Sequence, residues 1–204
     1  MHIEVAKSIH VDGIVNLQKL CFPSPFPEDC LWTSDHIERH LATFPLGQFV
    51  AIVDGIVVGS ASSLIITEES WRSHSGWMKT TGGFLFENHD REGTTLYGAD
   101  ISVHPAFRGR GIAKQLYLSR FELVVSSHLD RFGTACRTPG WLEWQVARRD
   151  ATYPEYCLAV VNGLVRDRTL TPLLRCGLQY HGVIENYMED NESGDGAALL
   201  EWKP

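Results

Sequence analysis

Residues 103–116, "VHPAFRGRGIAKQL", join an apolar, strand-like run to an amphipathic segment through two arginines and two glycines. Glycine tolerates positive φ angles and has no Cβ atom, so Gly109 and Gly111 permit a tight turn and close approach of a ligand. A helix that begins near Gly111 has unpaired amides and the positive end of its dipole in its first turn. Such a turn binds anions, and Arg108 and Arg110 add guanidinium groups that suit phosphate oxygens. The stretch therefore predicts a site for a phosphate ester, and a pyrophosphate fits it best.

Two common phosphate-binding loops do not match this stretch. The pattern G-x-x-x-x-G-K-[ST] is missing, and G-x-G-x-x-G fails because Lys114 stands where a third small residue is required. What does match is [Q/R]-x-x-G-x-[G/A], with Arg108, Gly111 and Ala113 at its fixed positions. The pattern and the run around it, "LYGADISVHPAFRGRGIAKQLY" (residues 96–117), resemble the acetyl-coenzyme A signature of the GNAT superfamily of N-acyltransferases.

Composition limits the remaining classes. The 204 residues suffice for one well-packed domain, and the net charge of −7 argues against nonspecific binding of nucleic acid or an anionic membrane. No apolar run approaches the roughly 20 residues that span a bilayer, and the first residues lack the pattern of a secretory signal. Five cysteines without a CxxC pair predict buried or unreactive thiols and a cytoplasmic location. No Cys/His spacing indicates a metal.

Hydrophobic periodicity predicts most of the elements, and their order indicates an α+β (mixed α/β) domain with a mainly antiparallel sheet. Helices are expected at 12–21 (stopped by Pro23 and Pro25), 35–44 and 111–127. Strands are expected at 2–9, 48–66 (a hairpin turned by Asp54-Gly55), 95–103, 130–137, 178–184 and 197–202. Residues 67–95 show no such pattern, and a loop this long is usually functional or mobile.

The resemblance to GNAT enzymes implies a twisted, mainly antiparallel sheet flanked by helices. Residues 1–204 would form a single domain, with a long insertion at about 67–95 and an irregular helical region at about 139–171. Short runs such as "ASSLI", "NHD", "PGW" and "GVIENY" resemble a GNAT subgroup that often precedes a nitrilase-like amidase domain. Because the chain ends at Pro204, no such second domain is expected.

The resemblance also implies that acetyl-CoA is the acyl donor. The exposed backbone of the strand would pair with the pantetheine arm, the amides after it would take the pyrophosphate, and a strand N–H near Val103 would polarise the thioester carbonyl. The coenzyme-binding residues expected on this basis are Ile101, Ser102, Val103, Arg108, Gly109, Arg110, Gly111, Ile112 and Ala113.

Asp100 is the candidate catalytic base, because many GNAT enzymes have an acidic residue three positions before the valine of this strand. A free aspartate has a pKa near 3.9, so burial or a water relay has to compensate. Alternatively, Asp100 binds a cationic group of the substrate or hydrogen-bonds the strand. The family's usual acid, a tyrosine in Y-x-x-x-G-F, is replaced here by Leu173. Tyr187 is the candidate substitute, with Tyr180 and Tyr153 as alternatives, and some family members need no such acid.

His74, Trp77 and His89 are the candidate substrate-binding residues of the 67–95 segment. A tryptophan can hold an amine through a cation–π contact, and a histidine titrates near neutral pH. The alternative is that these side chains pin a long loop to the domain.

The expected function is direct transfer of the acetyl group of acetyl-CoA to an amine acceptor in a ternary complex. A homodimer is compatible with the resemblance, and no nucleic acid or membrane partner is expected. The alternative is a catalytically weak acyl-CoA-binding sensor or interaction module with the same fold. Nucleotide phosphotransfer, a third interpretation, lacks both phosphate loops and a clear Mg²⁺ pair.

Overall fold

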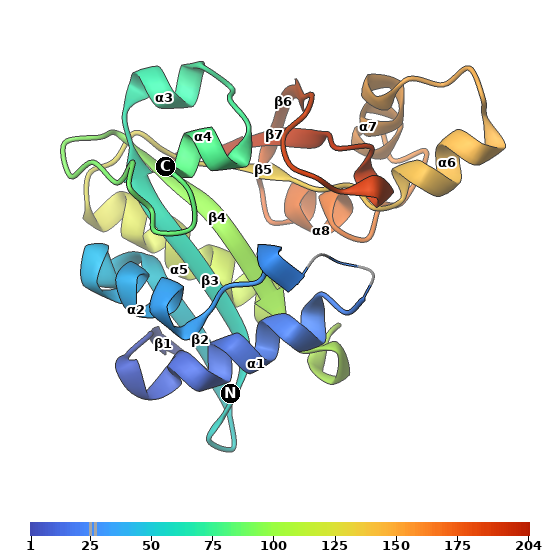
Figure 1. Ribbon diagram of the computed structural model, residues 1–204. Coiled ribbons are helices and arrows are strands. Elements are labelled where there is room, and N and C mark those ends of the chain that lie inside the picture. Colours follow the sequence, from blue (N-terminus) through green and yellow to red (C-terminus); the bar gives the residue numbers. More distant parts are fainter. Residues whose placement is uncertain (25, 27) are drawn as a thin grey trace.

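A seven-stranded sheet with the order β1-β2-β3-β4-β5-β7-β6 runs through the computed structural model, which describes residues 1–24, 26 and 28–204 (Figure 1). Every neighbouring pair is antiparallel except β4 and β5, which are parallel. The predicted mixed α/β class with a mainly antiparallel sheet is confirmed. The strands are β1 (His2–Val5), β2 (Gln48–Val53), β3 (Ile56–Ile66), β4 (Thr95–Val103), β5 (Arg131–Cys136), β6 (Gln179–Ile184) and β7 (Ala197–Trp202).

Helices cover both faces of this sheet. One core packs α1, α2, α3 and α4 against the sheet, and a second packs α5, α6, α7 and α8 against it. Figure 1 shows α1 and α2 in front of the sheet and α5 behind it. The α-helices are α1 (Val11–Cys21), α2 (Ser34–Thr43), α3 (Glu68–Arg72), α4 (Trp77–Thr81), α5 (Ile112–Ser126), α6 (Trp141–Ala147), α7 (Tyr153–Val161) and α8 (Leu170–Arg175). Single 3₁₀ turns lie at Ser8–His10, Glu28–Cys30, Pro45–Gly47, Pro105–Phe107 and Asn191–Ser193.

The N-terminal third follows the sequence prediction with small shifts. Asp54 and Gly55 both have positive φ angles (51° and 79°), as a two-residue turn between β2 and β3 requires, so the predicted hairpin is confirmed. The first strand is shorter than predicted, because a 3₁₀ turn follows it. His10 occupies the N-cap position of α1 without a side-chain hydrogen bond to the helix, and Asp12 lies inside its first turn. Pro25, predicted to help stop this helix, lies outside the described residues.

The 67–95 segment contains two short helices that periodicity did not predict. Five-residue helices such as α3 and α4 are too short to show a repeating apolar face. Thr67 caps α3 by accepting a hydrogen bond from the amide of Ser70. Trp71 and Trp77 are both buried and hold the segment against the sheet.

The sheet opens between β4 and β5. The two strands pair only from Thr95 and Arg131 to Gly98 and Thr134. Beyond that point β5 continues beside β7, whereas β4 continues to Val103 with only β3 as a neighbour. The opening lies in the middle of the molecule, where Figure 1 shows the two strands parting.

None of the helices within residues 1–24, 26 and 28–204 is long and apolar enough to cross a bilayer. All five cysteines are free thiols.

Candidate functional site

The turn between β4 and α5 has the geometry that an anion site requires. Gly109 and Gly111 have φ angles of 75° and 80°, which side chains with a Cβ atom rarely adopt. Gly111 caps α5, and the first backbone bond of the helix runs from the amide of Gln115 to its carbonyl. Among the described residues, the amides of 109–114 have no backbone acceptor. They are therefore free to bind a phosphate.

Both arginines of this turn are exposed, and both reach back toward the end of β4. Arg108 Nε donates to the carbonyl of Val103 at 3.2 Å. Arg110 Nη2 donates to the carbonyl of Ala106 at 3.3 Å, and its guanidinium lies 4.9 Å from the centre of the Phe107 ring. Two positive charges thus flank the open amides, and no carboxylate among the residues that the structure describes neutralises them.

The open part of β4 presents backbone groups to the gap. His104 donates its amide to Val58 of β3, and Val103 lies opposite Gly59. Residues of an antiparallel pair alternate between pairing with their neighbour and facing away from it. Val103 and Ile101 therefore turn their N–H and C=O groups toward the gap between β4 and β5.

Asp100 lies at the inner end of this open stretch, where α1 covers it. Gln18 of α1 accepts a hydrogen bond from the amide of Trp32 at 3.0 Å, which turns its NH₂ group toward the carboxylate. Ser102 Oγ donates to Asp100 Oδ2 at 3.3 Å. Burial raises the pKa of Asp100 to about 6, while the charge of Arg120 and these two hydrogen bonds act to lower it. A carboxylate with this pKa is ionised at neutral pH and still basic enough to accept a proton.

Cys21, at the last turn of α1, lies beside the same strand. Its Sγ donates to the carbonyl of Val103 at 3.3 Å. Burial and the neighbouring carboxylate of Asp100 raise the pKa of the thiol, so it stays protonated at neutral pH. Its role here is to cover the strand.

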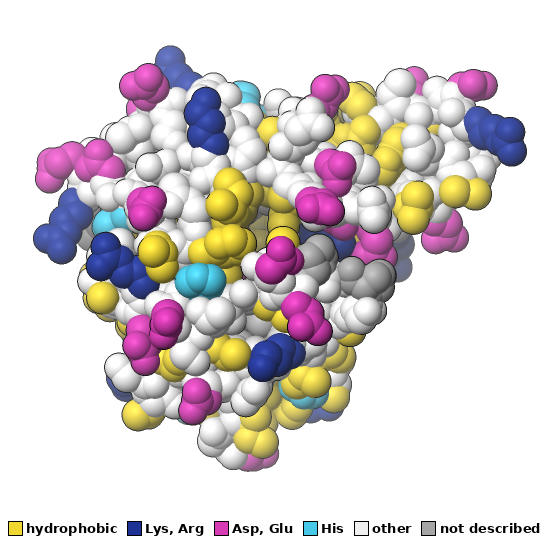
Figure 2. Space-filling view, in the orientation of Figure 1, with side chains coloured by type: hydrophobic (Ala, Val, Ile, Leu, Met, Phe, Trp, Pro, Cys, Tyr) yellow, Lys and Arg dark blue, Asp and Glu magenta, His cyan; other side chains and the backbone are white. Residues whose placement is uncertain are grey.

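Hydrophobic side chains gather in a hollow near the middle of the face that α1 and α2 share, with acidic side chains at its rim (Figure 2). The hollow occupies the part of the view in which Figure 1, drawn in the same orientation, shows β4 and β5 parting. Within the described part of the chain, no group of three or more His, Cys, Asp or Glu side chains could hold a metal ion.

Residues 11–139 match the model of the acetyltransferase (GNAT) family, which covers more than half of the chain. The chain belongs to the GNAT family. A curated relative, the uncharacterized N-acetyltransferase YkwB of Bacillus subtilis (strain 168), is 36% identical over 193 residues, which are 95% of this chain and 84% of the relative. The probable hydrolase YhcX of the same organism is 32% identical over 193 residues, 94% of this chain but only 36% of that longer protein.

Solved structures of other proteins share the fold of this chain. The GphF GNAT-like decarboxylase in complex with isobutyryl-CoA superposes with a TM-score of 0.81 at 22% identity, covering 100% of this chain and 99% of that one. That neighbour is in complex with isobutyryl-CoA, and the match includes the β4 strand and the glycine turn of this chain.

The candidate acid Tyr187 lies in the core of the GNAT domain. Its hydroxyl is 2.7 Å from that of Tyr97, and both side chains are buried. Burial and the Tyr97 hydroxyl raise the pKa of Tyr187 well above its ordinary value. Leu173, at the position of the family's usual tyrosine, is also buried in the core.

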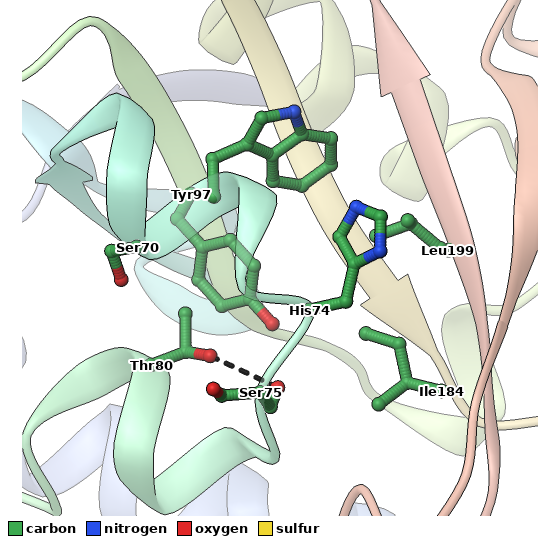
Figure 3. Close-up of a pocket in the computed structure, with 8 residues that line it drawn as sticks. Ser70, His74, Ser75, Thr80, Tyr97, Ile184 and Leu199 are labelled. Atoms are coloured by element: carbon green, nitrogen blue, oxygen red, sulfur yellow. Dashed lines mark hydrogen bonds between the residues drawn. The ribbon is translucent and has the colours of Figure 1, made fainter.

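The three candidate substrate residues have different surroundings. His74 lines a cavity of about 10 Å³, room for about one water molecule, beside Tyr97 (Figure 3). Trp77 is buried, and its Nε1 donates to the carbonyl of Ala99 at 3.0 Å. His89 Nδ1 accepts from the amide of Ile65 at 3.1 Å, and its ring stacks on another aromatic side chain. The structure does not bring the three together in one pocket.

Sequence reasoning missed two residues of the site, Gln18 and Arg120. Arg120 is 1% exposed, and its Nη2 donates to the carbonyls of Ser62 and Asp100. Both missed residues occupy positions on the apolar face of their helices, where a long polar side chain has to find a buried partner. A long polar residue on the apolar face of a predicted helix was therefore the signal available in the sequence.

Proposed function

We propose that this GNAT protein transfers the acetyl group of acetyl-CoA to an amine by direct attack in a ternary complex. The observation that carries the proposal is the continuity of the site. The backbone of Ile101 and the N–H of Val103 face the gap and lead from the free amides of the glycine turn to the half-buried carboxylate of Asp100. The carbonyl of Val103 accepts from Arg108 and Cys21. The proposed reaction needs a site for the diphosphate of the coenzyme, then a strand that pairs with its extended, amide-bearing arm, and then a proton acceptor for the amine. The protein presents these three parts in that order.

The coenzyme would lie along this path. The amides of 109–113, Ile112 and Ala113 included, take the diphosphate, and Arg108 and Arg110 turn toward it from the strand end. Ile101 and Val103 pair with the pantetheine arm as an added strand would. Ser102 contributes its hydroxyl, which orients the carboxylate of Asp100.

Asp100 would take the proton of the incoming amine. The attacking nitrogen forms a bond to the thioester carbon, the C–S bond breaks, and the coenzyme leaves as its thiolate. The N–H groups of β4 that face the gap stabilise the negative charge that develops on the carbonyl oxygen. Because the hydroxyl of Tyr187 is paired with that of Tyr97 in the core, we assign the thiolate no proton donor among the protein's side chains.

The absence of a tyrosine at Leu173 also favours the second candidate function, an acyl-CoA-binding module with weak catalysis. Several expectations stay part of the proposal: a cytoplasmic location, a homodimer, and kinship with GNAT domains that precede nitrilase-like amidases. The match to about a third of the longer YhcX supports the last of these.

Thiol release from acetyl-CoA, or from isobutyryl-CoA, in the presence of a panel of amines tests the proposed function. We expect turnover with at least one amine, and a preference for one of the two donors. Tight binding of both donors by calorimetry without turnover across the panel would favour the binding module. Failure to bind either donor would contradict both functions.

Gly111→Ala should weaken acetyl-CoA binding about tenfold. A Cβ atom at a φ of 80° costs about 1–2 kcal/mol, and the turn would relax out of the geometry that aims its amides at the diphosphate. Gly163→Ala is the matched control, because Gly163 has a φ of 73° and equally open space around its missing Cβ, but lies after α7. Equal affinities of the two variants by calorimetry would contradict the role of the turn.

A further inference from the structure

Three successive carbonyl groups of β4 each accept a hydrogen bond from a side chain where the strand leaves β5. The bonds run from Thr134 of β5 to Gly98 (2.8 Å), from Trp77 of α4 to Ala99 (3.0 Å), and from Arg120 of α5 to Asp100. Three elements therefore hold the backbone at the inner end of the gap, one of them from the 67–95 segment.

The middle carbonyl belongs to a β-bulge. Ser62 lies opposite Asp100 and Ser63 opposite Gly98, so Ala99 is the extra residue of β4. A bulged residue is left out of the ladder, and the neighbouring strand does not fix the direction of its carbonyl. The indole N–H of Trp77 supplies the bond that the ladder lacks.

The direction of the Ala99 carbonyl sets the orientation of the Asp100 side chain. A peptide unit is planar, so the C=O of Ala99 and the N–H of Asp100 point to opposite sides. Holding the carbonyl therefore fixes the plane from which the Cα–Cβ bond of Asp100 departs. The position of the carboxylate depends on the direction of this Cα–Cβ bond. Gln18 and Ser102 contact only the carboxylate group itself.

Trp77 is itself rigidly held. Its side chain is 8% exposed, and its ring lies 5.5 Å from that of Phe84. Its backbone amide donates to the carbonyl of Tyr187 at 2.8 Å. Trp77 thus connects the β6–β7 loop, through its backbone amide, to the bulge, through its indole, and the indole N–H is not free to bind a ligand.

We infer that Trp77 is a positioning residue for the transfer reaction: its indole N–H fixes the 99–100 peptide and so aims the carboxylate of Asp100 at the amine. This inference rests on the proposed function. It gives the 67–95 segment a role in catalysis that does not require it to touch the acceptor.

Trp77→Phe tests the inference, because it keeps an aromatic ring in place and removes only the donor. Trp144→Phe is the matched control, since the Nε1 of Trp144 is buried without a hydrogen-bond partner within the described part of the chain. We expect Trp77→Phe to lower kcat about tenfold, as the loss of one hydrogen bond predicts, with an unchanged Kd for acetyl-CoA. Trp144→Phe should change neither kcat nor the Kd for acetyl-CoA.

Amide hydrogen exchange measured by mass spectrometry gives a readout that does not depend on turnover. Exchange in the segment 96–104 should be faster in Trp77→Phe than in Trp144→Phe. Equal exchange in the two variants, equal kcat, or a loss of acetyl-CoA affinity as large as the loss of kcat would overturn the inference. If the unchanged protein turns over no amine, the proposed function fails, and the exchange experiment alone decides whether Trp77 orders the bulge.

Discussion

Asp100→Asn should lower kcat about a hundredfold or more while the Kd for acetyl-CoA stays the same. General base catalysis contributes about 10²–10⁴ to a rate, and an amide cannot accept the proton of the amine. In the proposed function the coenzyme pairs with backbone groups beyond this side chain, so we expect its affinity to stay unchanged. Stopped-flow thiol release and calorimetry on the same samples measure the two quantities separately.

Asp54→Asn is the control for this substitution. Asp54 lies in the turn between β2 and β3 with a φ of 51°, a position that asparagine also favours. Its replacement changes the net charge by the same amount without touching the site. A rise in KM for the amine at constant kcat would instead assign Asp100 to binding the cationic acceptor.

The pH dependence of the rate should follow the same carboxylate. Because the folded pKa of Asp100 is raised to about 6, the basic form is present above that pH and is lost as the pH falls through it. We therefore expect kcat/KM to rise with pH through about 6 and this limb to disappear in Asp100→Asn. If kcat/KM of the unchanged protein rose with pH near 4 instead, burial would not raise the pKa of the carboxylate that reacts.

The same shift makes Asp100 a cost to the fold at neutral pH. A carboxyl group with a raised folded pKa contributes stability that is fully present below its unfolded pKa of 3.8 and is lost as pH rises through 6. The shift corresponds to about 3 kcal/mol at 1.36 kcal/mol for each pKa unit. A carboxylate whose pKa is raised by burial despite a nearby positive charge is typical of a functional group.

The glycine turn and the strand before it could be predicted from the sequence because their determinants are local. The positive φ angles of Gly109 and Gly111, and the alternation of residues 95–103, depend on nearest neighbours in the chain. The bulge at Ala99 could not be predicted in this way. It depends on how β3, far away in sequence, is paired with β4, and Gly98 inside the strand is the one local sign of it.

The partners of Asp100 were equally hidden. Periodicity places Arg120 on the buried face of α5, but it cannot show that two carbonyls of the sheet lie within reach of the guanidinium. The sequence predicts that Trp77 binds the substrate, because a tryptophan can hold an amine through a cation–π contact. Only the folded chain reveals that its N–H is directed at the backbone of β4.

Arg120→Met should lower the free energy of unfolding by about 2–5 kcal/mol, the usual cost of removing one member of a buried polar network. Methionine fills much of the volume, but the buried carbonyls of Ser62 and Asp100 lose this donor. Removal of a buried charge relieves a desolvation cost. That relief does not compensate here, because the carboxylate of Asp100 and both carbonyls stay behind. Urea unfolding measures the loss.

The same variant should also move the pH profile. The charge of Arg120 lowers the pKa of Asp100, so its removal raises that pKa above 6 and shifts the acid limb of kcat/KM to higher pH. Arg131→Met is the matched control. Arg131 is also buried and pairs with Glu68 and Glu201, but it lies at the far end of β5 from the opening. Both variants should lose stability, and only Arg120→Met should move the limb. An unshifted limb in Arg120→Met, or equal shifts in both, would show that Arg120 supports the fold without tuning Asp100.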